Sequence, residues 1–383
     1  MSEWKTVRLG DVCEQIRGVS YKPADLHNDL DDNSVTLLRA NNIFEDVLNY
    51  DDLVYVDNKK VSNFQYLKRG DILICASSGS RNLVGKAACL EEDRKLTFGA
   101  FCKVLRTDTI NHGFFKHYFF SPTYRLTISN LSAGANINNI RAEDLDNLQI
   151  PLPPLETQKQ IAAVLDKCTS LISKYKKMLK KYDTLIKSRF IEMFGDPSKN
   201  NKKWEIKKLG DIIRVLGGYA FSSKAFKESG IPVLRIGNIN SGVFRPTNMV
   251  FWDDDEKIER YAIYPSDLVM SLTGTVGKDD YGNVCILGND YPKYYLNQRN
   301  AKLEIISDLE RLYLSYLLKF PEIKSRLTNI SRGIRQANIA NKDIENLQIP
   351  VPPLSLQNQF AAFVQQIDKS KFEIEKILKI MYN

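Results

Sequence analysis

The sequence predicts an α+β protein in which two duplicated mixed α/β domains are separated by a pair of long antiparallel coiled-coil helices. Three observations lead to this fold class. The chain has 383 residues, 43% of them hydrophobic, and a chain of this length usually divides into two domains. One long segment occurs twice, with its copies beginning at Asp144 and Asp343. Each copy is followed by apolar residues at heptad spacing, which is typical of packed helices.

The internal repeat fixes the expected domain boundaries. The segment Asp144-Leu-Asp-Asn-Leu-Gln-Ile-Pro-Leu-Pro-Pro-Leu155 returns as Asp343-Ile-Glu-Asn-Leu-Gln-Ile-Pro-Val-Pro-Pro-Leu354. The starts of the halves also match, because Trp4, Leu9, Gly10, Asp11 and Gly18 correspond to Trp204, Leu209, Gly210, Asp211 and Gly218. We therefore expect a first domain over residues 1–155, a central helix over 156–197, a second domain over 198–354 and a C-terminal helix over 355–383. Between the matching positions the halves differ, as expected of divergent loops on a shared scaffold.

Both expected helices carry an apolar stripe that calls for a helical partner. A capping-box pattern of Thr157 and Gln160 indicates the start of the central helix. The residues expected to pack between the helices or against a partner protein are Ile161, Val164, Leu171, Tyr175, Met178 and Leu185 in the central helix and Phe360, Phe363, Ile367, Ile374 and Ile377 in the C-terminal one. Matching stripes predict that the two helices pair antiparallel within the chain.

Charge and composition narrow the class of protein. The net charge is +8, and most of the excess lies in residues 156–203, which hold 12 Lys and Arg against 5 Asp and Glu. The six cysteines form no C-x-x-C pair and the chain has only three histidines, so a zinc site and a disulfide framework are not expected. Neither a signal peptide nor a membrane-spanning segment is evident, and we expect a cytoplasmic protein without a membrane partner.

These residues resemble a known family. Two diverged domains that each open with Trp-(x)₄-Leu-Gly-Asp and close with Leu-Gln-Ile-Pro-x-Pro-Pro-Leu-x-x-Gln before a long helix look like the specificity subunits of type I restriction-modification systems. The resemblance implies that each domain is a target-recognition domain that reads one half of a split, asymmetric site in double-stranded DNA. It also implies that the helices bind two methyltransferase subunits, with restriction subunits joining them, for N6-adenine methylation or cleavage.

One group of candidate DNA contacts lies in polar, glycine-bearing turns after short apolar strands. Small hydroxylated residues and glycine let backbone approach phosphates, and a nearby Lys or Arg supplies charge. The candidates are Ser78, Gly79, Ser80, Arg81 and Lys86 in the first half and Thr273, Gly274, Thr275 and Lys278 in the second. A plain turn is the competing interpretation. The spacing and the residue after Lys86 do not match a Walker A loop.

Further candidates have the side chains expected at base edges, because Asn and Gln pair with adenine and Arg pairs with guanine. Those before the helix entries are Asn136, Asn138, Asn139 and Arg141, and Arg332, Arg335, Gln336 and Asn338. Those in other segments are Arg39, Asn41 and Asn42, Arg235 and Asn238, and Gln298 with Arg299. Asparagine clusters also form ordinary turns. The aromatic-rich stretches around Phe115 and Tyr313 fit buried helices better than base stacking.

No catalytic signature is present in the sequence. Both Pro-Pro pairs lack the flanking residues that grip a flipped adenine, and no cofactor-binding glycine motif or metal-ligand cluster appears. We therefore expect a non-catalytic subunit that binds no cofactor. The resemblance implies that the partner subunits hold S-adenosylmethionine, and ATP with Mg²⁺ for restriction. A free-standing nuclease or methyltransferase and a purely structural adaptor are the alternatives.

Overall fold

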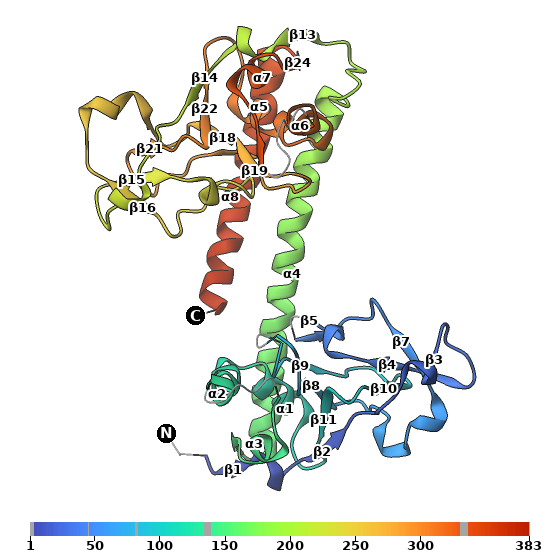
Figure 1. Ribbon diagram of the computed structural model, residues 1–383. Helices are drawn as coiled ribbons and strands as arrows, with labels where there is room; N and C mark the ends of the chain where they lie inside the picture. The colour runs from blue at the N-terminus through green and yellow to red at the C-terminus, as the bar shows by residue number, and fades with distance from the viewer. Residues whose placement is uncertain (1–3, 45, 81–82, 134–138, 330–335, 383) are drawn as a thin grey trace. The chain divides into compact units, whose positions relative to one another are not determined.

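The computed structural model describes residues 4–44, 46–80, 83–133, 139–329 and 336–382, and the chain folds as two compact units, residues 1–173 and 174–383. The boundary falls inside one helix, α4 (Leu155–Phe194), of 40 residues. The first half of α4 packs on the first unit and the second half packs on the second (Figure 1). The division of the chain into four segments stays a prediction.

The first unit is built on two four-stranded sheets. One sheet has the order β2 (Glu14–Arg17), β11 (Cys102–Arg106), β8 (Ile72–Cys75) and β9 (Ala87–Cys89), with all neighbours antiparallel. The other has the order β10 (Leu96–Phe98), β4 (Ser34–Leu38), β7 (Val54–Asp57) and β3 (Leu26–His27), in which β10 and β4 are parallel. Smaller pairs are β1 (Thr6–Arg8) with β12 (Gln149–Pro151) and β5 (Ile43–Phe44) with β6 (Val47–Leu48). The helices are α1 (His112–Phe119), α2 (Pro122–Ala133) and α3 (Ala142–Asp146).

The second unit repeats the antiparallel sheet and three strands of the mixed sheet. Its antiparallel sheet has the order β14 (Ile213–Gly217), β22 (Asn300–Ile305), β18 (Leu268–Ser271) and β20 (Val284–Ile286). Its mixed sheet has the order β16 (Val250–Trp252), β15 (Ile231–Leu234), β21 (Tyr294–Leu296) and β17 (Ala262–Ile263), with β15 and β21 parallel. The short pairs are β13 (Glu205–Lys208) with β24 (Gln348–Val351) and β19 (Thr273–Thr275) with β23 (Gln336–Asn338). The helices are α5 (Arg311–Leu318), α6 (Pro321–Thr328), α7 (Asn341–Glu345) and α8 (Leu354–Tyr382).

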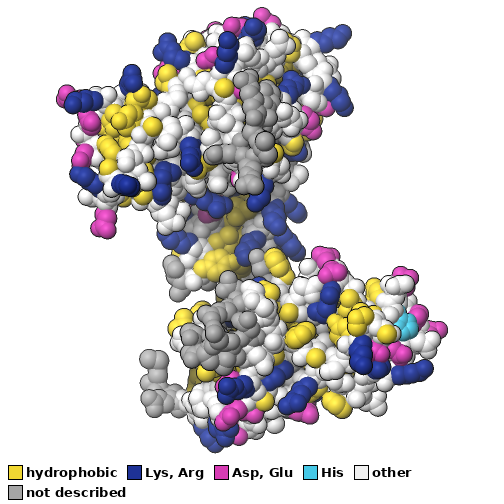
Figure 2. All heavy atoms as spheres, viewed as in Figure 1, with side chains coloured by type: hydrophobic (Ala, Val, Ile, Leu, Met, Phe, Trp, Pro, Cys, Tyr) yellow, Lys and Arg dark blue, Asp and Glu magenta, His cyan; other side chains and the backbone are white. Residues whose placement is uncertain are grey.

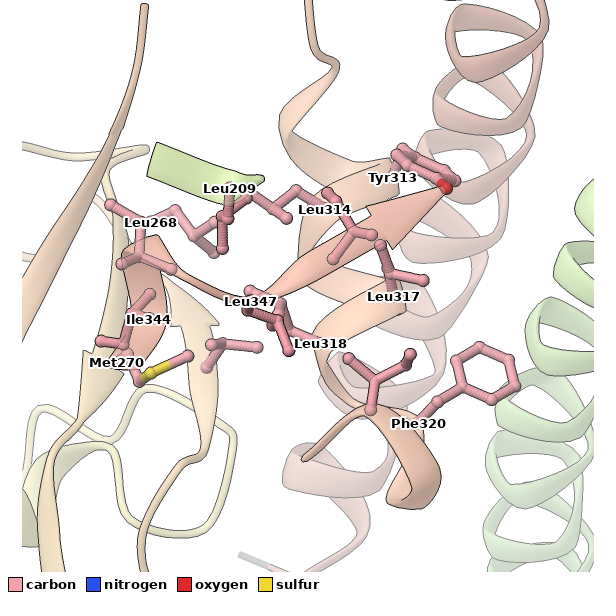
Figure 3. Close-up of a cluster of buried hydrophobic side chains, with 14 of the residues drawn as sticks. Leu209, Leu268, Met270, Tyr313, Leu314, Leu317, Leu318, Phe320, Ile344 and Leu347 are labelled. Carbon is pink, nitrogen blue, oxygen red and sulfur yellow. The ribbon is translucent and has the colours of Figure 1, made fainter. Parts of the chain in front are cut away.

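The expected fold class is confirmed, because each unit mixes helix and sheet and the antiparallel sheets have the same strand order. The mixed sheets share three neighbouring strands, and the fourth strand joins opposite edges, since β3 pairs with β7 and β17 pairs with β21. The aromatic stretches are buried in helices as expected: Phe115 and Phe119 of α1 and Tyr313 of α5 are fully buried. Figure 3 shows Tyr313, Leu314 and Leu317 among the side chains that form the core of the second unit. Among the described residues, no helix is both long and apolar enough to cross a membrane.

The helices α4 and α8 pair antiparallel within the second unit. The Phe360 ring lies 5.3 Å from that of Phe190, centroid to centroid. Lys371 bonds to Asp183 at 2.7 Å, and the Lys176 ammonium lies 5.6 Å from the Tyr382 ring centroid. Positions that ascend along α8 therefore meet positions that descend along α4.

Only part of the apolar stripe expected along α4 and α8 packs against other described residues of the chain. Phe360, Ile367 and Ile374 are buried, Ile161, Phe363 and Tyr175 are partly buried, and Ile377 is 38% exposed. Four residues of α4 that we expected to pack stay exposed in this chain: Val164 60%, Leu171 44%, Met178 41% and Leu185 46%. The covered row of α4 follows Ile172, Leu179 and Ile186, so the exposed row, seven residues apart, lies to one side of it.

One glutamine at each helix start joins helix to domain. Gln158 is 3% exposed; its side-chain oxygen accepts a hydrogen bond from Asn111 N (2.9 Å), and its amide donates to the Pro153 carbonyl (2.8 Å). Gln357 repeats these bonds with Glu310 N (2.8 Å) and the Pro352 carbonyl (2.7 Å). The helix starts at Leu155, earlier than the expected capping box, because this glutamine and the prolines before it set the entry.

We expect Gln357→Ala to lower the free energy of unfolding of the second unit by about 2 kcal/mol, because it leaves the partly buried Glu310 N–H and the buried Pro352 carbonyl without their side-chain partner. Urea unfolding followed by far-UV circular dichroism measures the change. The control is Gln365→Ala, at an exposed position of the same helix, for which a loss of about 0.5 kcal/mol or less is expected. Equal losses in both variants would contradict the anchoring role of Gln357.

Candidate DNA interface

Each unit contains a cleft at the equivalent position of the repeated fold. The first cleft has a volume of about 640 Å³ and is lined by Val19, Ser20, Tyr21, Arg39, Ala40, Asn41, Ser77, Ser78, Gly79, Gly99, Ala100, Phe101 and Cys102. The second has a volume of about 570 Å³ and is lined by Phe221, Ser223, Phe226, Arg235, Ile236, Gly237, Asn238, Thr247, Asn248, Asn297, Gln298 and Arg299. Predicted site residues from separate segments therefore meet in one place in each unit.

A 14-residue loop frames one wall of each cleft, from Arg39 to Asp52 and from Arg235 to Asn248. Both loops start with a short 3-10 turn after a buried strand, β4 or β15. Both end at a residue with positive φ, 52° at Asp52 and 53° at Asn248. Asp and Asn tolerate this left-handed conformation better than most residues.

The asparagines Asn42 and Asn238 brace these loops from within. Asn42 is fully buried; its oxygen accepts a hydrogen bond from Arg39 N at 2.8 Å, and its amide donates to the carbonyls of Asn49 and Asp51 at 3.0 Å each. Asn238 is 4% exposed and makes the equivalent bonds. We expected both at DNA from the sequence; in the structure they brace the loop, because every polar atom of the amide is already bonded to backbone.

The arginines that begin the loops have different partners in the two units. The Arg39 guanidinium donates to the Asp52 carboxylate at 2.9 Å, and Asn41 donates to the same carboxylate at 2.9 Å. Arg235 donates to the carbonyl of Asn248 at 2.6 Å. The Nε atoms of both arginines are buried without a hydrogen-bond partner. The first cleft is thus locally neutralised, whereas the second keeps its positive charge.

Two further groups of predicted residues meet beside the clefts. In the second unit, Thr273 pairs with Asn338 and Thr275 with Gln336 in the ladder of β19 and β23. In the first unit, Ser77 forms the equivalent bridge with Asn139. Asn139 and Asn338 are both exposed. The structure therefore brings the post-strand segment and the segment before the helix entry side by side in each unit.

The expected turn at Thr273, Gly274 and Thr275 is wrong, because these residues form strand β19. The Asp280 carboxylate accepts hydrogen bonds from Thr275 N (2.8 Å) and from the Thr275 hydroxyl (3.0 Å). A side chain at Gly274 would collide with Asp280 and Tyr281. Close packing against Asp280 and Tyr281 therefore accounts for the glycine at position 274. The backbone N–H of Thr275, which could have bound a phosphate, already donates to Asp280.

The remaining predicted residues fall outside the clefts or outside the described residues. Ser80 lies in the bend after Gly79, Lys86 is half-buried before β9, and Lys278 and Arg141 are exposed. Those outside the described residues are Arg81, Asn136, Asn138, Arg332 and Arg335.

Several cleft residues were missed from the sequence, among them Tyr21, Ala100, Phe101 and Phe226. The residue types expected at bases and phosphates are polar or charged, whereas these residues are mostly apolar. The internal alignment is the signal that identifies Ala100 and Phe101, because they occupy the position of the candidates Gln298 and Arg299 in the other half.

The cysteines of the described chain are all free thiols. Burial raises the pKa of Cys102, in the lining of the first cleft, to about 12, and burial likewise raises that of Cys285 to about 12. These thiols therefore stay protonated and poorly nucleophilic. Within the described ranges, no group of three or more His, Cys, Asp and Glu side chains could hold a metal ion.

We expect Asn238→Asp to destabilise the second unit by about 1–3 kcal/mol, because the carboxylate cannot donate to the Arg245 and Thr247 carbonyls. Limited proteolysis should then cut the loop between residues 239 and 247 faster than in the unchanged protein. Asn346→Asp, at an exposed position, is the matched control. Unchanged cleavage in Asn238→Asp would show that the loop does not depend on this amide.

Comparison with known proteins places the chain in a family. The model of the type I restriction modification DNA specificity domain matches residues 1–181 and again residues 201–380. The EcoKI type I restriction enzyme specificity subunit of Escherichia coli strain K12 is 32% identical, over 97% of this chain and 84% of its own length. The StySPI specificity subunit of Salmonella potsdam is 29% identical over the same shares.

A solved structure supports the fold. The crystal structure of the type I restriction-modification S subunit from M. genitalium superposes with a TM-score of 0.60 at 15% identity, and the match covers 99% of this chain and 93% of that one. The repeat, the paired clefts and these matches agree. The chain therefore belongs to the type I restriction modification DNA specificity family and is a specificity subunit, a non-catalytic protein that recognises DNA.

Proposed function

We propose that each cleft reads one half of a bipartite, asymmetric site in double-stranded DNA. The observation that carries this proposal is that two equivalent clefts are framed by the same loop bracing yet lined by different side chains. A common frame places both clefts alike on their units. Different linings give each cleft its own chemistry, so the two half-sites differ in sequence.

The flanking segments would hold the phosphate backbone. Lys278 and Arg141 are exposed beside the β19–β23 ladder and the Ser77–Asn139 bridge respectively. Contacts of this kind set position and carry no sequence information directly. Their electrostatic part makes affinity fall as salt rises.

The exposed apolar row of α4 is the proposed docking surface for methyltransferase subunits. Figure 2 shows apolar side chains along α4 and α8 with Lys and Arg beside them. Val164, Leu171, Met178 and Leu185 remain uncovered by the described part of this chain, and a stripe of large apolar side chains marks a protein interface more often than free surface. We propose that two methyltransferase subunits bind, that restriction subunits join them, and that these partners hold S-adenosylmethionine, and ATP with Mg²⁺.

The test of DNA specificity uses the assembled complex. The chain and its methyltransferase partner are expressed in a host without N6-adenine methylation, and the methylated sites are mapped by sequencing. We expect one bipartite motif that disappears when this chain is omitted. Methylation that persists without the chain, or a purified chain that methylates or cuts DNA alone, would favour the free-standing enzyme.

The test of docking uses Met178→Glu with Leu185→Glu. We expect the double variant to lose the methyltransferase subunit in size-exclusion chromatography, because two charges enter an apolar contact. Thr184→Glu with Ser188→Glu, at exposed positions of the same helix, supplies the control with equal charge. A complex that stays intact in both variants would place the interface elsewhere.

A further inference from the structure

The two clefts share one frame, and a single turn within it differs. Gly18 and Gly218 let the chain pass tightly across this turn, since a Cβ on Gly18 would lie 2.1 Å from the Gly99 oxygen and one on Gly218 would lie 2.3 Å from the Asn297 oxygen. Parallel bridges join Val19 to Gly99 and Tyr219 to Asn297. The backbone of the turn is therefore held in the same place in both units.

Hydrogen bonds establish which residues are equivalent in the turn. Ala100 N donates to the Val19 carbonyl at 3.0 Å, and Gln298 N donates to the Tyr219 carbonyl at 2.9 Å. The next carbonyl, that of Phe101, accepts from Ala76 N at 2.9 Å, and that of Arg299 accepts from Leu272 N at 2.8 Å. Phe101 and Arg299 therefore stand at the same position of the two clefts.

These two side chains offer opposite chemistry. Phe101 is 69% exposed in the lining of the first cleft, beside the small side chain of Ala100. Arg299 and Gln298 are exposed in the second, and neither side chain has a hydrogen bond or ion pair with any described residue. The Arg299 guanidinium and the Gln298 amide are therefore hydrogen-bond donors without a described partner, whereas the Phe101 ring is a solvent-exposed apolar surface.

The surrounding charge reinforces the difference. Asp52 neutralises Arg39 in the first cleft, whereas Asn248, at the equivalent position, offers Arg235 only a carbonyl. No carboxylate lines the described wall of the second cleft. The two arginines of this cleft favour an electronegative partner, and the major groove offers such a partner in the N7 and O6 edge of guanine.

We infer that Phe101 and Arg299 are the specificity-determining residues of the two half-sites. Arg299, assisted by Gln298, reads a guanine through N7 and O6 in the half-site of the second unit. Phe101 packs on the 5-methyl group of a thymine in the half-site of the first unit. This inference rests on the proposed reading of DNA by the clefts, and it adds which base each cleft takes and through which atoms.

The first experiment maps methylation by the complex carrying Arg299→Ala. We expect one guanine position in one half-site to become degenerate while the other half-site is unchanged. Arg214→Ala, a surface arginine of β14 paired with Glu304, is the control and should leave the motif intact. An Arg299→Ala complex that methylates the same motif more weakly at every site would show a phosphate contact and overturn the inference.

The second experiment changes single atoms of the DNA in binding assays with the full complex. Replacing the assigned guanine by 7-deazaguanine should weaken binding roughly 10-fold for the unchanged protein and leave binding by Arg299→Ala unaffected. Replacing thymine by uracil in the other half-site should weaken binding of the unchanged protein about 3-fold. Phe101→Ala should abolish this sensitivity to the methyl group. The control Phe64→Ala, at another exposed position, should retain it. Equal sensitivity in variant and unchanged protein would overturn the assignment.

The two levels of the hypothesis fail differently. A crosslinkable amino acid in place of the exposed Val276 identifies which half-site contacts the second unit. If that half-site contains no guanine, the proposed role of Arg299 is wrong. If the bipartite motif depends on this chain but the Phe101 and Arg299 variants keep it unchanged, only the inference fails. If no motif depends on the chain, the proposed function fails first.

Discussion

Each unit of this protein depends on one buried glutamine that joins its domain to its helix. Gln158 and Gln357 each bond a backbone N–H at the start of a domain helix and a proline carbonyl at the helix entry. A buried donor or acceptor without a partner is costly. The glutamine, the prolines and the start of the following helix therefore depend on one another, and this junction tolerates little change. The strands β12 and β24 immediately before it pair with β1 and β13 in separate two-stranded sheets, so the start of each domain and the helix entry are held together.

This rigid frame leaves the cleft linings free to differ. The loop bracing by Asn42 and Asn238 and the glycine crossings at Gly18 and Gly218 use backbone contacts that do not depend on neighbouring side chains. Substitutions at the turn between β10 and β11, or between β21 and β22, therefore alter the chemistry of a cleft without altering its place. A duplicated domain can in this way acquire two unlike DNA contacts on one scaffold.

The long helix α4 has two apolar faces with different roles. One face is covered inside the chain, where Ile186 and Phe190 join the core of the second unit with Phe360. The other face, with Met178 and Leu185, stays exposed. A heptad pattern identifies both faces together, because consecutive residues such as Leu185 and Ile186 both belong to apolar rows that repeat every seven positions. The two rows are one residue step apart, about 100° around the helix. Only the packing of α8 shows which row is satisfied within the chain.

The sequence by itself determined the duplication, the mixed fold, the two long helices and the family, because these follow from repeated local patterns that survive divergence. The tertiary structure decided how the candidate residues are used. It gathered Arg235 with Gln298 and Arg299 in one cleft, turned Asn42 and Asn238 into loop braces, and made a strand of the turn expected at Thr273–Thr275. It also placed the apolar side chain of Phe101, which was not among the sequence candidates, in the lining of the first cleft. Such roles depend on burial and on partners distant in the chain, which residue type and spacing do not encode.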